Sequence, residues 1–171
     1  MWQLVVAFGE IVLRRRGPES LPDSDFLVLF LLAAYVLVTL VDLTMIGGLT
    51  RLDLVLLSAN IALLLAFVFA TLTFFKVERR YRQTISAIIG AEIVITLTYL
   101  PFAIVAIALG IDVAEGPFLW LRLGFLFWWL FVAACVLARS LSQPLIVGMM
   151  FAILYLHTSL SISYLLTPAT D

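Results

Sequence analysis

The stretch Lys76-Val77-Glu78-Arg79-Arg80-Tyr81-Arg82 divides the chain and decides how it is organised. It holds four of the ten lysine and arginine residues, and a long apolar segment lies on each side of it. A bilayer core tolerates charge poorly, so this basic loop has to lie outside the hydrocarbon. Short loops rich in lysine and arginine face the cytoplasm. The loop, with Lys76, Arg79, Arg80 and Arg82, is therefore predicted to be cytoplasmic.

The composition is typical of an integral membrane protein. The 171 residues are 64% hydrophobic and 12% charged, whereas an ordinary soluble domain is about half apolar and a quarter charged. A spanning helix needs about 20 mostly apolar residues. The chain therefore has room for five such helices and leaves none for a soluble domain. Its single cysteine, Cys135, excludes an intrachain disulfide and a thiol-based metal cluster.

The N-terminal segment is a short apolar run that ends in three arginines, Arg14–Arg16. A secretory signal carries its positive residues before the apolar run, so this order argues against a signal peptide. The run is also too short to cross a bilayer. We expect residues 2–14 to form a helix lying along the cytoplasmic membrane surface, with the arginines near anionic headgroups. The alternative is a partly ordered tail.

Helix breakers and charged turns divide the rest of the chain into five apolar spans. The sequence predicts an all-α polytopic membrane helix bundle, in which an N-terminal interfacial amphipathic helix precedes five transmembrane helices. Residues 1–25 are the cytoplasmic helix and linker, residues 26–166 the bundle, and residues 167–171 a short outer tail. The spans are predicted at about 26–46, 54–75, 85–109, 118–138 and 144–166, with tight turns at 49–53, 110–117 and 139–143.

The positive charges predict the orientation of this bundle. With the N-terminus inside, eight lysines and arginines are cytoplasmic and two, Arg51 and Arg122, lie toward the outside. The eight are Arg14, Arg15, Arg16, Lys76, Arg79, Arg80, Arg82 and Arg139. Such a bias over short loops favours five spans with the N-terminus in the cytoplasm and the C-terminus outside.

Polar side chains within the spans are the candidates for a functional site, because a charge at a helix centre costs about 2.5–3.5 kcal/mol on insertion scales. Helical rise places one polar residue in the outer part of each span. These candidates are Asp42, Asn60, Tyr99, Arg122 and His157. We expect Asp42 to contact Arg122 directly, or through Asn60, His157 or a water. Glu92 is expected to stand apart as an isolated intramembrane acid nearer the cytoplasm.

Two interpretations of these residues are open. The five form either a polar site that opens to the outer side, or a structural ion pair with satisfied polar groups that hold the helices together. Glu92 likewise has two alternatives. It is uncharged within the membrane, or it reaches Arg79, Arg80 or Arg82 at the cytoplasmic surface.

Several chemical functions lack their usual signals. The sequence has no glycine-rich phosphate loop, no paired-histidine metal motif and no Ser-His-Asp arrangement at a plausible spacing. The lone His157 leaves nothing from which to assemble a zinc site, and the basic loop has no folded surface that would suit nucleic acid. We therefore expect no enzyme, no cofactor, no metal and no nucleic-acid partner.

The arrangement of the segments resembles the Yip1-like membrane proteins. The resemblance lies in a cytoplasmic amphipathic N-terminus, the Gly17-Pro18 break and five closely spaced spans. The Asp-Leu-Tyr-Gly-Pro motif of the eukaryotic members is absent, and the nearest string is Val41-Asp42-Leu43-Thr44, so no site residues are carried across. The resemblance implies a small membrane scaffold without a known catalytic role.

Two functions follow as expectations. The first is a non-enzymatic scaffold or accessory subunit that binds other membrane proteins, or a second copy of itself, through apolar helix faces in the lipid bilayer. The second is a small transporter or channel subunit with a polar site in the outer half of the bundle. A scaffold should seal the polar groups by packing, whereas a transporter should leave a path to them. The compact loops and the absence of an organelle-targeting signal favour a bacterial inner membrane.

Overall fold

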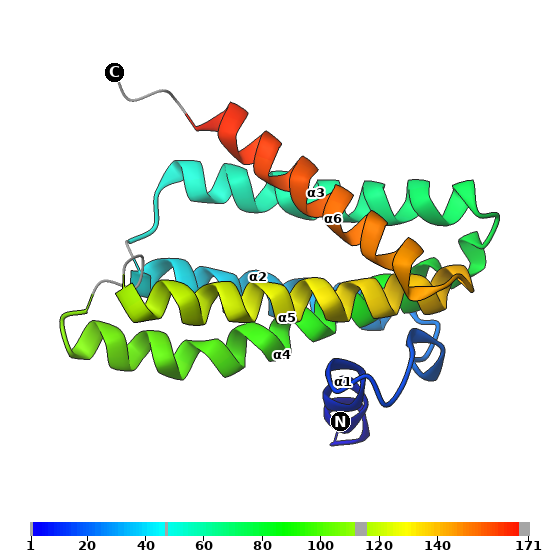
Figure 1. Ribbon diagram of the computed structural model, residues 1–171, viewed down its shortest axis with the longest axis horizontal. Coiled ribbons are helices and arrows are strands. Elements are labelled where there is room, and N and C mark those ends of the chain that lie inside the picture. Colours follow the sequence, from blue (N-terminus) through cyan, green and yellow to red (C-terminus); the bar gives the residue numbers. More distant parts are fainter. Residues whose placement is uncertain (1, 47, 112–115, 168–171) are drawn as a thin grey trace.

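The computed structural model describes residues 2–46, 48–111 and 116–167, with the backbone alone for residues 2–5 and 46. The described residues form helices and no strands, as the sequence predicts (Figure 1). The elements are α1 (Trp2–Val12), η1 (Pro18–Ser20), α2 (Asp25–Ile46), α3 (Arg51–Phe74), η2 (Glu78–Arg80), α4 (Tyr81–Ala108), α5 (Gly116–Leu141) and α6 (Leu145–Leu166).

Five of these helices, α2 to α6, are long and apolar enough to cross a membrane. This confirms the predicted number of spans, and each observed helix overlaps its predicted range. Large apolar side chains remain exposed along them, from Phe26 in α2 to Leu165 in α6. In a bilayer such side chains contact lipid tails, so their exposure suits a membrane protein.

The predicted turn at 49–53 is too long. Thr50 is the N-cap of α3, and Arg51, Leu52 and Asp53 already form its first turn. Thr50 and Asp53 make a reciprocal capping box, in which the Asp53 amide donates to Thr50 Oγ1 (3.2 Å) and the Thr50 amide donates to the Asp53 carboxylate (2.9 Å). Similarly, α5 continues through Leu141 into the predicted turn at 139–143. Gly47, the acidic stretch 112–115 and the tail 168–171 lie outside the described residues.

The spans form two layers (Figure 1). Helices α2, α4 and α5 run side by side in one layer, and α3 and α6 lie over it in the second. All eight basic residues predicted to be cytoplasmic belong to the segments at one end, where α1, the α3–α4 connection and the α5–α6 connection meet. We call this the basic end; α6 finishes at the opposite end.

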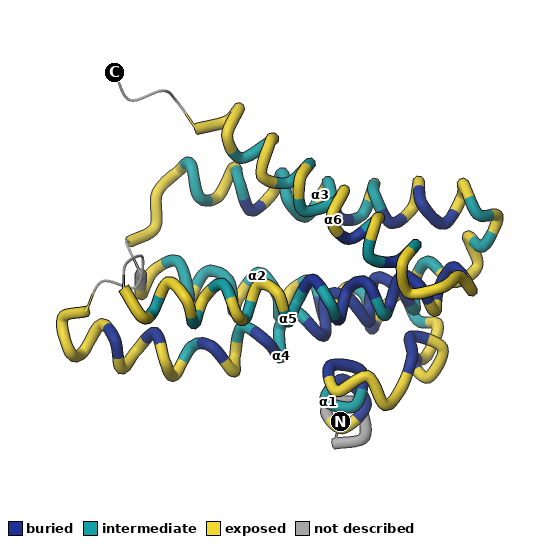
Figure 2. The backbone as a smooth tube through the Cα atoms, viewed as in Figure 1, coloured by how far each residue is buried: buried dark blue, intermediate teal, exposed yellow. Residues whose placement is uncertain are grey.

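The packed core lies in the half of the bundle near the basic end. Buried residues concentrate in the first part of α4, from Thr84 to Ala91, and in the last part of α5, from Leu130 to Leu141 (Figure 2). Small residues bring α5 and α6 together here: a Cβ atom on Gly148 would overlap the Ala134 carbonyl oxygen and lie 2.8 Å from the Ala138 nitrogen. Toward the opposite end α6 diverges from α5 (Figure 1). The two layers therefore separate as they leave the basic end.

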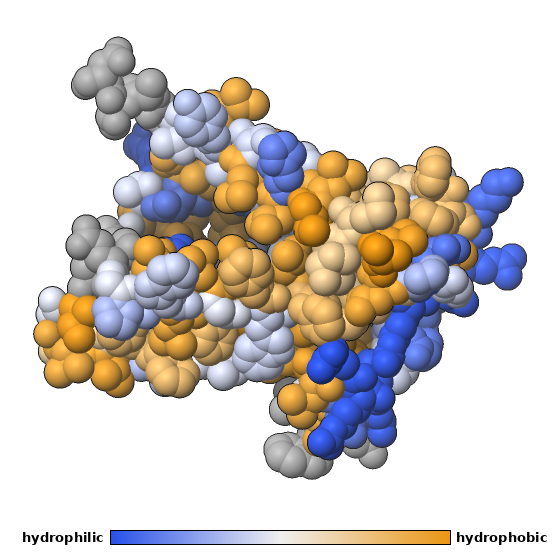
Figure 3. Space-filling model, viewed as in Figure 1, coloured by the Kyte–Doolittle hydropathy of each residue, from blue (hydrophilic) through white to orange (hydrophobic). Residues whose placement is uncertain are grey.

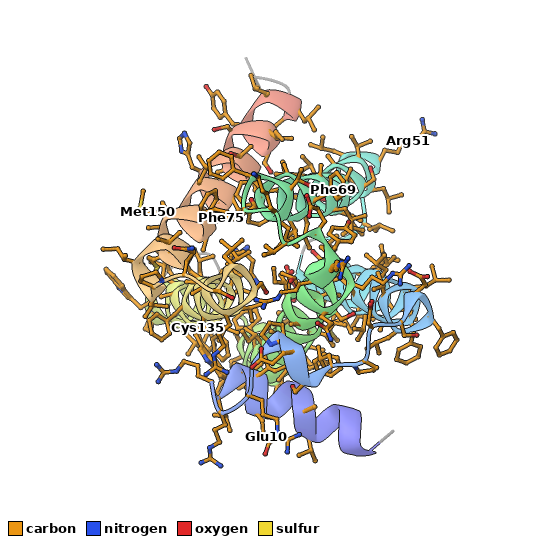
Figure 4. All side chains as sticks on the ribbon, turned by 90° about the vertical axis from the view of Figure 1, so that its right-hand side faces the viewer. Glu10, Arg51, Phe69, Phe75, Cys135 and Met150 are labelled. Atoms are coloured by element: carbon orange, nitrogen blue, oxygen red, sulfur yellow. The ribbon has the colours of Figure 1, made fainter. Side chains whose placement is uncertain are left out.

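Helix α1 lies across the bundle and not along it. Figure 4 looks along the spans from the basic end and shows α1 lengthwise, whereas Figure 1 shows it nearly end-on. Ala7, Phe8, Ile11 and Val12 are buried, and α1 packs against α4 and α5. The predicted helix at the N-terminus is therefore present, ending at Val12, and its apolar face is covered by protein.

Candidate functional site

A cavity of about 360 Å³ lies where the layers separate, and all five spans contribute to its wall. This volume is within the roughly 300–1,000 Å³ typical of small-molecule sites. Figure 3 shows a hollow on this face of the molecule between the α3–α6 layer and α5, toward the end away from the basic residues. The cavity is lined by Tyr35, Asp42, Asn60, Glu92, Ile95, Thr96, Tyr99, Arg122, Phe125, Leu126, Trp129, Tyr155, Leu156 and Ser159.

A seven-residue spacing places the polar lining residues in two levels. On each of α2, α4 and α5, two lining residues are seven positions apart, which is almost two helical turns and roughly 10 Å along the axis. The pairs are Tyr35 with Asp42, Glu92 with Tyr99, and Arg122 with Trp129. Residues seven apart share one helix face, so each helix presents both members of its pair to the cavity.

The deep level consists of Tyr35, Glu92, Trp129 and Tyr155. The Tyr35 hydroxyl donates a hydrogen bond to Glu92 Oε1 at 3.3 Å, which joins α2 to α4. The rings of Trp129 and Tyr155 lie with their centroids 5.9 Å apart and join α5 to α6. This level therefore combines one carboxyl group with three aromatic side chains near the middle of the spans.

The rim level consists of Asp42, Tyr99 and Arg122. Tyr99 is buried, with 8% of its surface exposed, and its ring packs edge-on against Phe125 at 5.4 Å between centroids. Arg122 is exposed, and Asp42 is partly buried. The rim thus carries one acid and one base around a buried phenol.

Three residues of the cavity wall each carry a buried side-chain atom that has no hydrogen-bond partner among the described residues. These atoms are Asp42 Oδ1, Tyr99 Oη and Trp129 Nε1. Buried polar groups are nearly always satisfied, because leaving one without a partner costs about 1–3 kcal/mol. The three residues that carry these atoms all line the same cavity.

The expected direct contact between Asp42 and Arg122 does not form, and the alternative of a link through a water stays a prediction. Both residues line the cavity. Within the described part of the chain neither belongs to an ion pair, and no hydrogen bond joins them directly or through Asn60 or His157. The expectation rested on their similar depth, which fixes the level of a side chain and not the helix face on which it lies.

Two other expected positions also need correction. His157 does not line the cavity; it lies on the exposed side of α6, where its carbonyl oxygen accepts a hydrogen bond from Ser161. Glu92 does not stand apart, since it lines the same cavity as Asp42, Asn60, Tyr99 and Arg122. It does not reach the arginines of the basic loop. Its partner is Tyr35, which is not among the residues predicted from the sequence.

Asn60 joins α3 to α6 within the second layer. Its side-chain amide donates to the Leu56 carbonyl oxygen at 3.1 Å, and its Oδ1 accepts a hydrogen bond from the Ser159 hydroxyl. Both residues also line the cavity. Asn60 is therefore satisfied by protein, in contrast to the unpartnered atoms on the opposite wall.

The predicted basic loop has a structural part at the basic end. Arg80 Nη1 donates to the carbonyl oxygens of Arg139 (3.2 Å) and Ser140 (2.8 Å) and to Ser142 Oγ (2.8 Å), and so caps the last turn of α5. Arg82 pairs with Asp25 at 2.6 Å, at the start of α2. Lys76 and Arg79 are exposed. The loop thus ties three helix ends together.

The deep level contains the residues that sequence reasoning missed. Tyr35, Trp129 and Tyr155 are aromatic residues in apolar helices, and most such residues only fill space. The signal that could have identified Tyr35 and Trp129 is their seven-residue spacing from Asp42 and Arg122, which places them on the same helix faces as these polar residues. Tyr155 carries no such signal, because His157, the polar residue expected on α6, lies on another face.

No group of three histidine, cysteine, aspartate or glutamate side chains that could hold a metal ion occurs among the described residues. No known protein family, curated protein or solved structure matches the chain.

Proposed function

We propose that this protein binds a small polar solute inside the membrane and acts as a small transporter or channel subunit. The observation that carries the proposal is the cavity of about 360 Å³, which is lined by all five spans and by three residues that each carry a buried polar atom without a partner among the described residues. A protein that only packs its polar groups together would leave no such space. Unpaired buried polar groups are costly, and their position in residues of the cavity wall supports an occupant that pairs with these residues.

The proposal includes an orientation. All eight basic residues expected on the inner side belong to segments at the basic end, which supports a cytoplasmic position for that end. The cavity then opens in the outer half of the membrane, with the deep level near its middle. We place the protein in a bacterial inner membrane, with the N-terminus inside and the C-terminus outside.

The scaffold function stays a prediction. A scaffold should have its intramembrane polar groups paired within the protein. Asn60 and Ser159 meet this expectation, because they are hydrogen-bonded to each other. Asp42, Tyr99 and Trp129 do not, since each has a buried polar atom without a partner in the cavity wall. The three residues with unpaired polar atoms favour solute binding over a scaffold function.

Ligand-induced stabilisation tests the proposal across several classes of solute at once. The purified protein in detergent is heated in the presence of millimolar ammonium ions, amino acids, sugars and carboxylates. A ligand present at 100 times its Kd stabilises the folded state by about 2.7 kcal/mol. We expect members of at least one class to raise the unfolding temperature.

Two threonines on α4 supply a matched pair of variants. Thr96 lines the cavity, whereas Thr98 is exposed and its hydroxyl bonds to the Val94 carbonyl oxygen. Thr96→Trp fills the cavity and should abolish the stabilisation, and Thr98→Trp should preserve it. The proposal fails if no solute class stabilises the wild-type protein, or if both variants respond to the solute as the wild type does.

A further inference from the structure

The charges that line the cavity are unevenly distributed between its two levels. The rim carries Asp42 and Arg122, whose formal charges cancel. The deep level carries Glu92 and no basic residue, and no lysine, arginine or histidine in the described part of the chain forms an ion pair with Glu92. A carboxylate buried in an apolar medium needs a positive partner or has to give up its charge. An occupant of the deep level can supply that partner.

The side chains around Glu92 are suited to a particular kind of cation. Tyr35, Trp129 and Tyr155 surround this level with aromatic rings, and Trp129 and Tyr155 pack at an angle of 45° to each other. The faces of such rings attract positive charge, most strongly for tryptophan, and aromatic walls are a recurrent means of binding ammonium groups. A bare metal ion would instead require several oxygen ligands, and the deep level offers one carboxyl and two phenols.

The rim level carries polar groups that can form hydrogen bonds with an occupant of the cavity. Tyr99 is more than nine-tenths buried, and its hydroxyl has no partner. Asp42 Oδ1, also unpartnered, lies at the same level. Because the two levels are roughly 10 Å apart along the helices, an occupant with its charge beside Glu92 extends toward this polar rim.

From this distribution we infer that the occupant is a small organic ammonium ion, whose charge lies between the Glu92 carboxylate and the rings of Tyr35, Trp129 and Tyr155. The inference rests on the proposed function, since it names the class of solute that the cavity takes. The Tyr35 hydroxyl holds the Glu92 carboxylate in place for the cation. The polar rim accepts a hydroxyl or a similar group from the same molecule.

Choline and its uncharged carbon isostere, dimethylbutanol, test the inference because they differ in charge and hardly in shape. Choline should raise the unfolding temperature of the purified protein, and dimethylbutanol should not at the same concentration. Glu92→Gln keeps the size of the side chain and its bond to Tyr35, and should weaken choline binding at least tenfold. Glu78→Gln, an exposed acid in η2, is the matched control and should bind choline like the wild type.

A second readout avoids any change at Glu92. In a Cys135→Ala background, a cysteine at Thr96 lies in the cavity wall. Choline should protect it from a water-soluble thiol reagent, and dimethylbutanol should not. Tyr155→Leu removes one aromatic wall and should reduce this protection severalfold.

The outcomes separate this inference from the proposed function. If sugars, carboxylates or dimethylbutanol stabilise the protein as well as choline does, the cavity binds solutes and the ammonium assignment is wrong. Unchanged choline binding by Glu92→Gln, or binding of the zwitterion glycine betaine without binding of choline, would also overturn it. If no solute of any class stabilises the protein, the proposed function itself fails.

Discussion

Gly148 lies at a close contact between α5 and α6. A side chain there would overlap backbone atoms of Ala134 and Ala138, and a backbone cannot move aside as a flexible side chain can. Such close contacts between small residues hold membrane helices together where the hydrophobic effect does not.

We expect Gly148→Ala to destabilise the protein by about 1–3 kcal/mol, the usual cost of overpacking a tight interface. Gly124→Ala is the matched control, because no atom lies within 4 Å of a Cβ at that position in α5. It should be neutral or stabilising by up to about 1 kcal/mol, since alanine favours the helix over glycine. Unfolding in detergent by heat or denaturant measures both, and equal effects would contradict the packing described.

At the scale of single residues, the sequence predicted which polar side chains lie within the apolar spans. It did not predict which of them are in contact. Depth along a helix follows from residue number, and four of the five predicted cluster residues line the cavity. The rotation of each helix about its axis is set by packing against its neighbours. This rotation turned His157 outward and brought Glu92 to Tyr35. No single-helix pattern contained that information.

Helix α1 is held to the bundle by a close contact between Phe8 and Gly90. A Cβ atom at position 90 would overlap the ring of Phe8, which is 6% exposed. Arg14, just beyond α1, lies over the ring of Phe131 at 4.8 Å and accepts a hydrogen bond from Arg139 at its carbonyl oxygen. These contacts join α1 to α4 and α5 and keep it across the bundle.

Phe8→Ala should release α1 while the spans stay folded. Losing a buried phenylalanine costs about 3–5 kcal/mol in a protein core, which is enough to undock a short helix. Hydrogen exchange of the α1 amides should then become at least tenfold faster, and exchange in α4 should change little. Leu13→Ala, at a position 59% exposed, should leave exchange in α1 as it is. Unchanged exchange in Phe8→Ala would show that α1 is held by other means.

The elements themselves were largely predictable, because breakers and charges mark their ends. The helix start at Thr50 was missed although the sequence contains its signal, a threonine followed three residues later by an aspartate. The packing of α1 was not predictable. An amphipathic helix with an apolar face has the same sequence pattern whether lipid or protein covers that face. Only the tertiary contacts distinguish the two.

For the whole molecule, the separation of the two layers determines where the cavity lies. Near the basic end α4, α5 and α6 pack tightly, and Arg80 caps the last turn of α5. At the opposite end the divergence of α6 exposes polar groups from both layers. The number and order of the helices followed from the sequence. The divergence did not, because it depends on the crossing angle of α5 and α6.

The proposed orientation predicts which ends are accessible from outside an intact cell. In a Cys135→Ala background, a cysteine at Leu49, between α2 and α3, should react with an impermeant maleimide. A cysteine at Arg79, in η2 at the basic end, should react only after the membrane is permeabilised. Both positions are exposed in the structure, so access is decided by the membrane. The reverse labelling pattern would invert the orientation.

Water access to the cavity tests the central claim most directly. Cysteines are introduced singly at Thr96, in the cavity wall, and at Thr98, on the exposed face of α4 that meets lipid. A thiol reacts as its thiolate, which forms in water and not in hydrocarbon. A charged, impermeant thiosulfonate added from outside should therefore modify Thr96→Cys at least tenfold faster than Thr98→Cys. Equal rates, or a Thr96→Cys that does not react, would contradict the account that water and solutes reach this cavity in preference to the lipid-facing side of α4.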